Sequence, residues 1–176
     1  TVPYPEEVTR EMIERISAEM LVSYPSPSRL YRVLARTLGV GESQILLTNG
    51  SDAGIKALFE TYVSEGDAVS YLDPSYAMYA VYTRMYGAQS SPISFSSDLA
   101  LSADDIMRKI GISTRLVALA NPNQPTGTVV DQEDLQKVAR HCESMGSLLL
   151  IDEAYYPFHP DTALGLIGEY RNLIIS

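Results

Sequence analysis

The sequence has few of the residues that mark several common protein classes. In 176 residues it contains one cysteine, Cys142, no tryptophan and two histidines, His141 and His159. One cysteine cannot form an internal disulfide, and we read the two histidines as structural or solvated, so no metal site is expected. Apolar runs such as 148–151 fall far short of the roughly 20 residues of a membrane-spanning helix. With no signal-peptide pattern at its start, the chain is expected in a reducing cytoplasm, as a thiol-containing protein without a membrane span.

Positive charge is also scarce. The chain has 13 Lys and Arg against 22 Asp and Glu, which gives a net charge of -9. No basic stripe is present, so a nucleic-acid phosphate backbone is not an expected partner.

The two ends of the chain suggest that it is part of a longer protein. The chain starts at Thr1 without Met and stops on the apolar run 173–175, which reads as a buried strand. We therefore expect a fragment that lacks part of its own active site.

Apolar residues recur with two different periods along the chain. Spacing of three to four predicts helices over 6–22, 28–38, 52–64, 76–86, 102–110 and 131–145. Short β-rich runs predict strands over 44–48, 68–72, 92–95, 115–120, 147–151 and 172–175. Several strands are continuously hydrophobic, which indicates a sheet covered on both faces. The alternation predicts an α/β fold with three layers, helix, sheet and helix, and a mostly parallel sheet.

Ligands in such folds bind where the strands end, so the residues that follow each strand are the candidates. The first strand leads into Asn49, Gly50, Ser51 and Asp52 and then a helix. Free amides at the start of a helix, with its dipole, favour an anion, and Gly50 permits a tight turn. The alternative is an ordinary N-cap, in which Ser51 or Asp52 satisfies these amides. A nucleotide P-loop is excluded because no Gly-Lys-Ser/Thr ending is present.

Two more strands deliver polar or aromatic groups to the same edge. Tyr76 follows Asp73-Pro74-Ser75 and would stack on a flat ring, although an isolated Tyr is more often packed in the core. The segment 121–127, Asn-Pro-Asn-Gln-Pro-Thr-Gly, would hold a polar substituent in a set direction. Its alternative interpretation is a Pro- and Asn-rich turn.

Asp152 emerges from the apolar strand 147–151 and is followed by Glu153, Ala154 and Tyr155. A carboxylate in such surroundings requires a cation or hydrogen-bond donors. Either Asp152 holds magnesium in a nucleotide hydrolase, or it pairs with a protonated heterocycle. The hydrolase interpretation fails, because it needs a Gly-Lys phosphate loop and all three lysines, Lys56, Lys109 and Lys137, lie outside such a motif.

Taken in order, these motifs closely resemble the class I/II aminotransferases that use pyridoxal 5'-phosphate, and especially the histidinol-phosphate aminotransferase branch. The resembling stretches are 48–52, 73–79, 121–127 and 152–155. The resemblance implies the large domain of a pyridoxal-phosphate-dependent transferase with an aspartate aminotransferase-like fold, truncated here. It also implies residues 1–30 as an N-terminal helix and dimer-facing arm, and 31–176 as the first part of the cofactor-binding domain.

The resemblance implies a role for each matching residue. Gly50, Ser51 and Asp52 would hold the cofactor phosphate through the backbone, and Tyr76 would stack on the pyridine ring. Asp152 would keep the pyridine nitrogen protonated, so that the ring accepts the electrons left when the substrate loses its α-proton. Tyr155 would donate to the ring oxygen. Tyr24, in a Tyr-Pro motif, would cross a homodimer interface to the neighbouring site.

Two departures from the family pattern bear on these roles. The family has Asn directly before Pro-Thr-Gly, where this chain has Gln124, so either Gln124 makes the same bond or Asn123 replaces it. The family's Schiff-base lysine follows the strand at which this chain ends, and none of its three lysines takes that place. The 176 residues alone are therefore not expected to transaminate. The family's tight loop also leads us to expect a cis bond between Gln124 and Pro125.

The resemblance implies an exchange of an amino group between an amino acid, such as L-histidinol phosphate, and 2-oxoglutarate. Two alternatives remain open on the residues. One is a lyase of the threonine-phosphate decarboxylase type with the same cofactor site. The other is a module that keeps the fold and only binds or dimerises.

Overall fold

The computed structural model describes residues 3–156 and 158–176, which form two compact units, one up to Leu46 and one from Leu47 onwards. The first unit is helical. It consists of α1 (Glu6–Glu14), α2 (Ala18–Val22), α3 (Ser28–Leu38) and the 3-10 turn η1 (Glu42–Gln44). The helix predicted over 28–38 is confirmed.

Two predictions for the first part of the chain are wrong. The single helix expected over 6–22 is interrupted at 15–17, because the Ser17 hydroxyl accepts a hydrogen bond from the Met20 N–H at 3.2 Å and starts a second helix there. The strand expected over 44–48 is absent. The Gly41 N–H donates to Gln44 Oε1 at 2.9 Å and closes the turn η1 instead. Ile45 then has extended backbone without a ladder partner among the described residues, so β propensity alone does not produce a strand.

The second unit contains a five-stranded, wholly parallel sheet in the order β2-β1-β3-β4-β5. The strands are β1 (Ala68–Asp73), β2 (Gln89–Ser94), β3 (Thr114–Ala120), β4 (Leu148–Asp152) and β5 (Leu173–Ile175). The five strands predicted downstream of residue 60 are thereby confirmed. The prediction for β2 began at residue 92, three residues late, because its polar start gives no apolar signal and is fixed by pairing of Gln89 with Ala68.

The helices of this unit are α4 (Ser51–Tyr62), α5 (Met78–Met85), α6 (Ala103–Met107), α7 (Gln132–Met145) and the 3-10 turn η2 (Ala163–Leu166). Each of the four predicted helices is present, and every end lies within three residues of the predicted one. No helix among the described residues is long and apolar enough to span a membrane.

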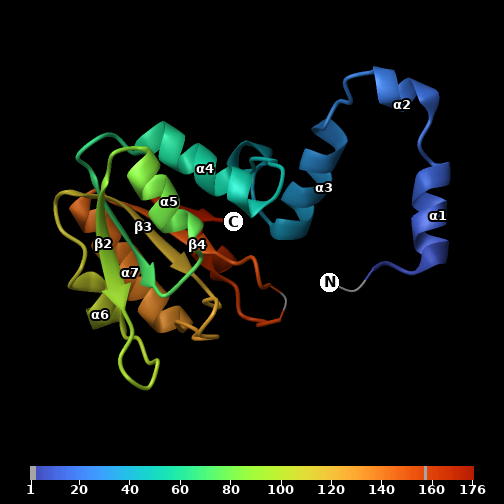
Figure 1. Ribbon diagram of the computed structural model, residues 1–176. Coiled ribbons are helices and arrows are strands. Elements are labelled where there is room, and N and C mark those ends of the chain that lie inside the picture. Colours follow the sequence, from blue (N-terminus) through green and yellow to red (C-terminus); the bar gives the residue numbers. More distant parts are fainter. Residues whose placement is uncertain (1–2, 157) are drawn as a thin grey trace. The chain divides into compact units, whose positions relative to one another are not determined.

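Two separate hydrophobic cores flank the sheet, which confirms the three layers. One core joins α4 and α5 to one face of the sheet, through residues such as Ile55, Phe59 and Tyr82. The other joins α6, α7 and η2 to the opposite face, through residues such as Leu135 and Leu166. In Figure 1, α4 and α5 lie on one side of the strands, and α6 and α7 lie on the other. Neighbouring residues of β3 alternate between these cores, which is why the strand reads as continuously apolar.

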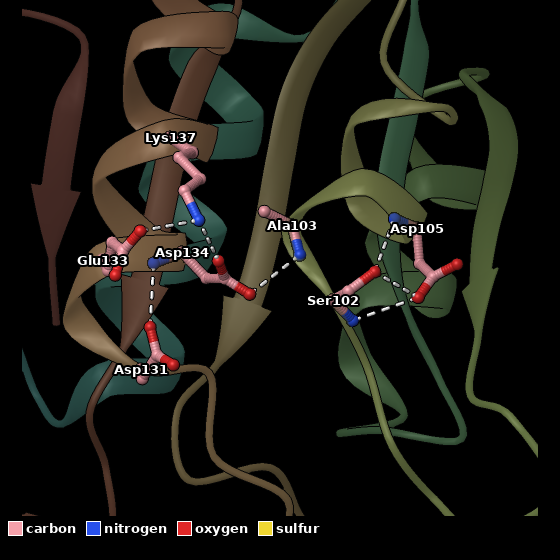
Figure 2. A network of polar contacts seen from close by, with 7 residues as sticks. All are labelled: Ser102, Ala103, Asp105, Asp131, Glu133, Asp134 and Lys137. Carbon is pink, nitrogen blue, oxygen red and sulfur yellow. Dashed lines mark hydrogen bonds and ion pairs between the residues drawn. The ribbon is translucent and has the colours of Figure 1, made fainter.

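A polar network ties α6 to α7 (Figure 2). The Ser102 hydroxyl accepts from the Asp105 N–H and starts α6, and Asp131 accepts from the Asp134 N–H and starts α7. The Asp134 carboxylate accepts from the Ala103 N–H at 3.1 Å and from Lys137 Nζ at 2.9 Å. One carboxylate thus joins the first turn of α6 to the first two turns of α7.

The strand order reverses at β1, which pairs with β2 on one side and with β3 on the other. In an open parallel sheet this reversal opens a crevice at the carboxyl ends of the strands. Pairing of Ala120 with Asp152 places the ends of β3 and β4 side by side at that edge. The segments that follow β1, β3 and β4 therefore meet at one place.

Candidate functional site

A cavity of about 310 Å³ lies at this edge of the sheet. Its lining comes from the start of α4, the segment that follows β1, and the last residues of β3 and β4 with the segments that follow them. These residues are Ser51, Tyr76, Ala120, Pro122, Gln124, Asp152, Ala154 and Tyr155. Five residues that the sequence singled out are thus brought together although they are spread over more than 100 positions of the chain.

The start of α4 leaves backbone amides at the cavity. Gly50 is the N-cap residue, with a φ of 82°, a left-handed value that favours glycine, and it forms no side-chain cap. The Thr48 hydroxyl donates to the Gly50 carbonyl at 2.8 Å and holds the turn. Ser51, the first residue of the helix, lines the cavity. The first-turn amides and the helix dipole therefore favour an anionic group here.

Tyr76 presents a half-buried aromatic ring to the cavity. Its hydroxyl donates to Asp52 Oδ1 at 3.1 Å, and its ring meets that of Tyr79 edge-on, with centroids 5.7 Å apart. Burial raises the pKa of Tyr76 above its usual value, and the hydrogen bond to Asp52 and the negative charge of that carboxylate add to the rise. The phenol therefore stays protonated at neutral pH and acts as a donor to Asp52.

Asp152 is the last residue of β4 and is only 5% exposed. Its Oδ2 accepts from the Tyr79 hydroxyl at 2.6 Å, and its Oδ1 accepts from the Ala154 N–H at 3.1 Å. No ion pair joins it to a Lys, Arg or His among the described residues. A buried carboxylate held only by neutral donors, at the wall of a cavity, has unused acceptor capacity toward a cationic group.

Tyr79 contacts Asp152 and was not predicted from the sequence as a site residue. It is fully buried on α5, and its pKa is raised strongly, first by burial and then by the charge and hydrogen bond of Asp152. It is therefore a permanent hydrogen-bond donor to Asp152. The available signal was its position three residues after Tyr76, which places both rings near one helix turn.

In the loop 121–127, two side-chain amides form hydrogen bonds within the protein and a third lines the cavity. Asn121 exchanges two hydrogen bonds with the backbone of Val130, and Asn123 donates to the Pro74 carbonyl and accepts from the Ser75 hydroxyl. Gln124 lines the cavity, and its bond to Pro125 is cis, as predicted. Of the two amides considered from the sequence, Asn123 is thus used to fasten the loop that precedes Tyr76, and Gln124 is the one at the cavity.

Tyr155 follows Asp152 and lies on a loop that Glu153 fastens. The Glu153 carboxylate accepts from the Thr162 hydroxyl at 2.7 Å and from the Ala163 N–H at 2.6 Å, which closes the loop at η2. Tyr155 is half exposed and stands between the first cavity and a second, more open hollow of about 410 Å³ that it shares with Gln124. No sequence motif predicted this second hollow.

Tyr24 belongs to the first unit and is fully exposed, in the segment between α2 and α3. Its expected role at a neighbouring site stays a prediction. Lys56, Lys109 and Lys137 do not line the cavity, so none of the chain's lysines reaches it.

The chain is similar to known aminotransferases in sequence and in fold. A family model described as aminotransferase class I and II matches residues 5–176. Curated relatives include the histidinol-phosphate aminotransferase of Thermoanaerobacter pseudethanolicus, which is 35% identical over 97% of this chain and 49% of its own length. That of Carboxydothermus hydrogenoformans is 33% identical over 98% of this chain and 49% of its own. The chain thus spans about half the length of the curated relatives it matches.

Among solved structures, the histidinol-phosphate aminotransferase of Sinorhizobium meliloti, crystallised in complex with pyridoxal-5'-phosphate, is 25% identical with a TM-score of 0.77 over 87% of this chain and 43% of its own. The aspartate aminotransferase of Thermus thermophilus with maleate is also 25% identical, with a TM-score of 0.74 over 84% of this chain and 41% of its own. The fold is therefore that of the pyridoxal-phosphate-dependent aminotransferases, and the chain belongs to the class I and II aminotransferase family.

Proposed function

We propose that the cavity between α4, Tyr76 and Asp152 binds pyridoxal 5'-phosphate, and that the protein is an aminotransferase of the histidinol-phosphate branch. The observation that carries this proposal is Asp152, a buried carboxylate without a cationic partner among the described residues, at the wall of a cavity that an aromatic ring also lines. A protonated nitrogen heterocycle supplies the missing positive charge.

The other residues of the cavity fit the same cofactor. The uncapped amides after Gly50 suit its phosphate, and the ring of Tyr76 suits its flat pyridine. Gln124 and Tyr155 are the donors available to its ring oxygen. When bound, the cofactor supplies an electron sink for the α-carbon of an amino acid.

In this proposal the residues of the chain hold the charged groups of the cofactor and the proton on its ring nitrogen in place. Asp152 would keep a proton on the heterocycle, and Tyr79 holds Asp152 in position through its 2.6 Å hydrogen bond. Because the donors to Asp152 are uncharged, no positive side chain among the described residues competes with the ligand for this carboxylate. The amides and dipole at the start of α4 would hold the phosphate, and Tyr76 would pack against the ring.

L-Histidinol phosphate and 2-oxoglutarate are the substrates we propose, on the support of the histidinol-phosphate aminotransferases that resemble this chain. We further propose a cytoplasmic homodimer in which Tyr24 of each subunit serves the partner's site. Because no lysine lines the cavity, the 176-residue chain alone is proposed to be inactive. The functional experiments therefore use the full-length protein.

The test combines cofactor binding with substitution of Asp152. Full-length protein mixed with pyridoxal 5'-phosphate should develop an absorbance band absent from the free cofactor. Asp152→Ala should lower the transamination rate about 100-fold or more, because one electrostatic contact in a water-excluded site has that effect on rate. Asp104→Ala, an exposed carboxylate on α6, is the matched control and should leave the rate unchanged. Near-normal turnover of Asp152→Ala would contradict the assignment.

A further inference from the structure

Asp52 places a negative charge where the proposed cofactor phosphate would bind. It is the second residue of α4, in the turn whose amides are uncapped. A carboxylate in the first turn of a helix is attracted by the free amides and the positive end of the dipole. Left to itself, the Asp52 side chain would compete with a phosphate for these amides and would repel it.

The structure holds the Asp52 carboxylate by other donors. The Tyr82 hydroxyl donates to Oδ2 at 3.0 Å and approaches Oδ1 at 3.1 Å, and the Tyr76 hydroxyl donates to Oδ1 at 3.1 Å. Both carboxylate oxygens are thereby engaged from outside α4. The two phenols come from the segment that follows β1, with Tyr82 on α5 itself.

Tyr82 is a rigid donor because the core fixes its ring. The residue is 4% exposed, and its ring centroid lies 5.6 Å from that of Phe59 on α4. Burial raises the pKa of Tyr82, with further rises from its hydrogen bond to Asp52 and from the charge of that carboxylate, so the hydroxyl keeps its proton at neutral pH. The position of the donor is thus set by packing between α4 and α5, independently of any ligand.

We propose that Tyr82 is a positioning residue that, together with Tyr76, holds the Asp52 carboxylate away from the first-turn amides of α4 and keeps them open for the cofactor phosphate. This inference rests on the proposed function. Through Asp52 it also links the anion site to Tyr76, which donates a hydrogen bond to the same carboxylate and is expected to stack on the ring.

The experiment compares two probes that differ only in the phosphate. Equilibrium binding of pyridoxal 5'-phosphate and of pyridoxal to the full-length protein is followed by absorbance. Tyr82→Phe keeps the packed ring and removes only the hydroxyl. Its affinity for pyridoxal 5'-phosphate should fall about tenfold, the size expected for one hydrogen bond to a carboxylate, while its affinity for pyridoxal stays within about twofold of the parent.

Removing the charge of Asp52 should restore binding. The double variant Tyr82→Phe with Asp52→Asn should recover the affinity for pyridoxal 5'-phosphate to within about threefold of the parent, since the repulsive charge is gone. Tyr86→Phe is the matched control. Tyr86 directly follows the last residue of α5 and its ring stacks on Phe59, so this variant should bind both probes with the affinity of the parent.

The binding measurements can contradict the role of Tyr82 and the proposed function separately. An unchanged affinity of Tyr82→Phe for pyridoxal 5'-phosphate, an equal loss for both probes, or no recovery in the double variant would overturn the role of Tyr82. Failure of the unsubstituted protein to bind pyridoxal 5'-phosphate would instead overturn the proposed function. The two failures are therefore distinguishable.

Discussion

At the scale of single residues, two carboxylates are held by two tyrosines of one helix. Tyr79 donates to Asp152, and Tyr82, three residues further along α5, donates to Asp52. Both tyrosines belong to the core between α5 and the sheet, so their hydroxyls are fixed by packing. The two buried tyrosines are neutral hydrogen-bond donors. They hold each carboxylate in place and bring no positive charge next to it.

Another buried titratable group, Cys142, predicts how stability depends on pH. Burial raises the pKa of its thiol from 9.0 to about 12. The unfolded chain therefore loses this proton at lower pH than the folded chain, and the stabilisation present below pH 9 is lost as pH rises toward 12. We expect the free energy of unfolding to fall by up to about 1.4 kcal/mol per pH unit in this window from this group alone.

The measurement is denaturant unfolding at pH 8 and pH 10 for the parent protein and Cys142→Ala. Because buried tyrosines also titrate at high pH, the informative quantity is the difference between the two proteins. The variant should show the shallower decline. Equal declines would show that the thiol does not contribute, and rapid labelling of the folded protein by a thiol reagent at pH 8 would contradict its burial.

At the scale of helices and strands, polar side chains decide where elements start and which ones adjoin. Ser17 divides an apolar periodic stretch into α1 and α2, and Asp131 starts α7. Asp134 reaches from α7 to the first amide of α6, and hydrogen bonding to Lys137 and to Ala103 holds its pKa below the usual range, against the opposing effect of burial. Helix caps of this kind are short-range, whereas the bridge between α6 and α7 requires the folded chain.

Asp134→Ala should therefore destabilise the protein by about 2 kcal/mol, because it removes a carboxylate bond to a backbone amide and leaves that amide without its partner. Glu133→Ala is the matched control, since Glu133 contacts the same Lys137 from an exposed position and should cost less than about 0.5 kcal/mol. Chemical denaturation of the two variants measures both values. Equal losses would show that the link to Ala103 contributes nothing.

At the scale of the whole second unit, the sheet separates two cores that do not share side chains. Ile55 on α4 belongs to one, and Ile151 on β4 belongs to the other; both are fully buried. The cavity proposed to bind the cofactor lies at the sheet edge, at the ends of β3 and β4. Its geometry therefore depends on both cores.

Ile55→Val and Ile151→Val should each cost about 1 kcal/mol, the usual effect of removing one buried methyl group. Because the two residues lie on opposite faces of the sheet, the double variant should lose the sum of the two within about 0.5 kcal/mol. Thermal or denaturant unfolding of the three variants tests this expectation. A clear departure from additivity would show that the two cores are coupled.

The sequence predicted much of this fold because strong local patterns marked it. The continuously apolar strands β3 and β4 and the periodic helices α3 and α7 were placed to within a few residues. Where the hydrophobic pattern was weak, the predicted bounds of the strand were wrong. The polar start of β2 is set by its partner β1. The β-rich run 45–48 fails in the opposite way: its pattern favours a strand, yet it belongs to none of the strands in the described part of the chain.

By itself the sequence determined the family, the layers of the fold and the set of residues at the strand ends, because periodicity, caps and motifs are properties of neighbours along the chain. Only the tertiary structure decided which groups touch. It turned Asn123 to the loop before Tyr76, left Gln124 at the cavity, and placed Tyr79 and Tyr82 on the two carboxylates. Contacts between residues 30 or 73 positions apart depend on how helices pack across the sheet, and no local pattern contains that information.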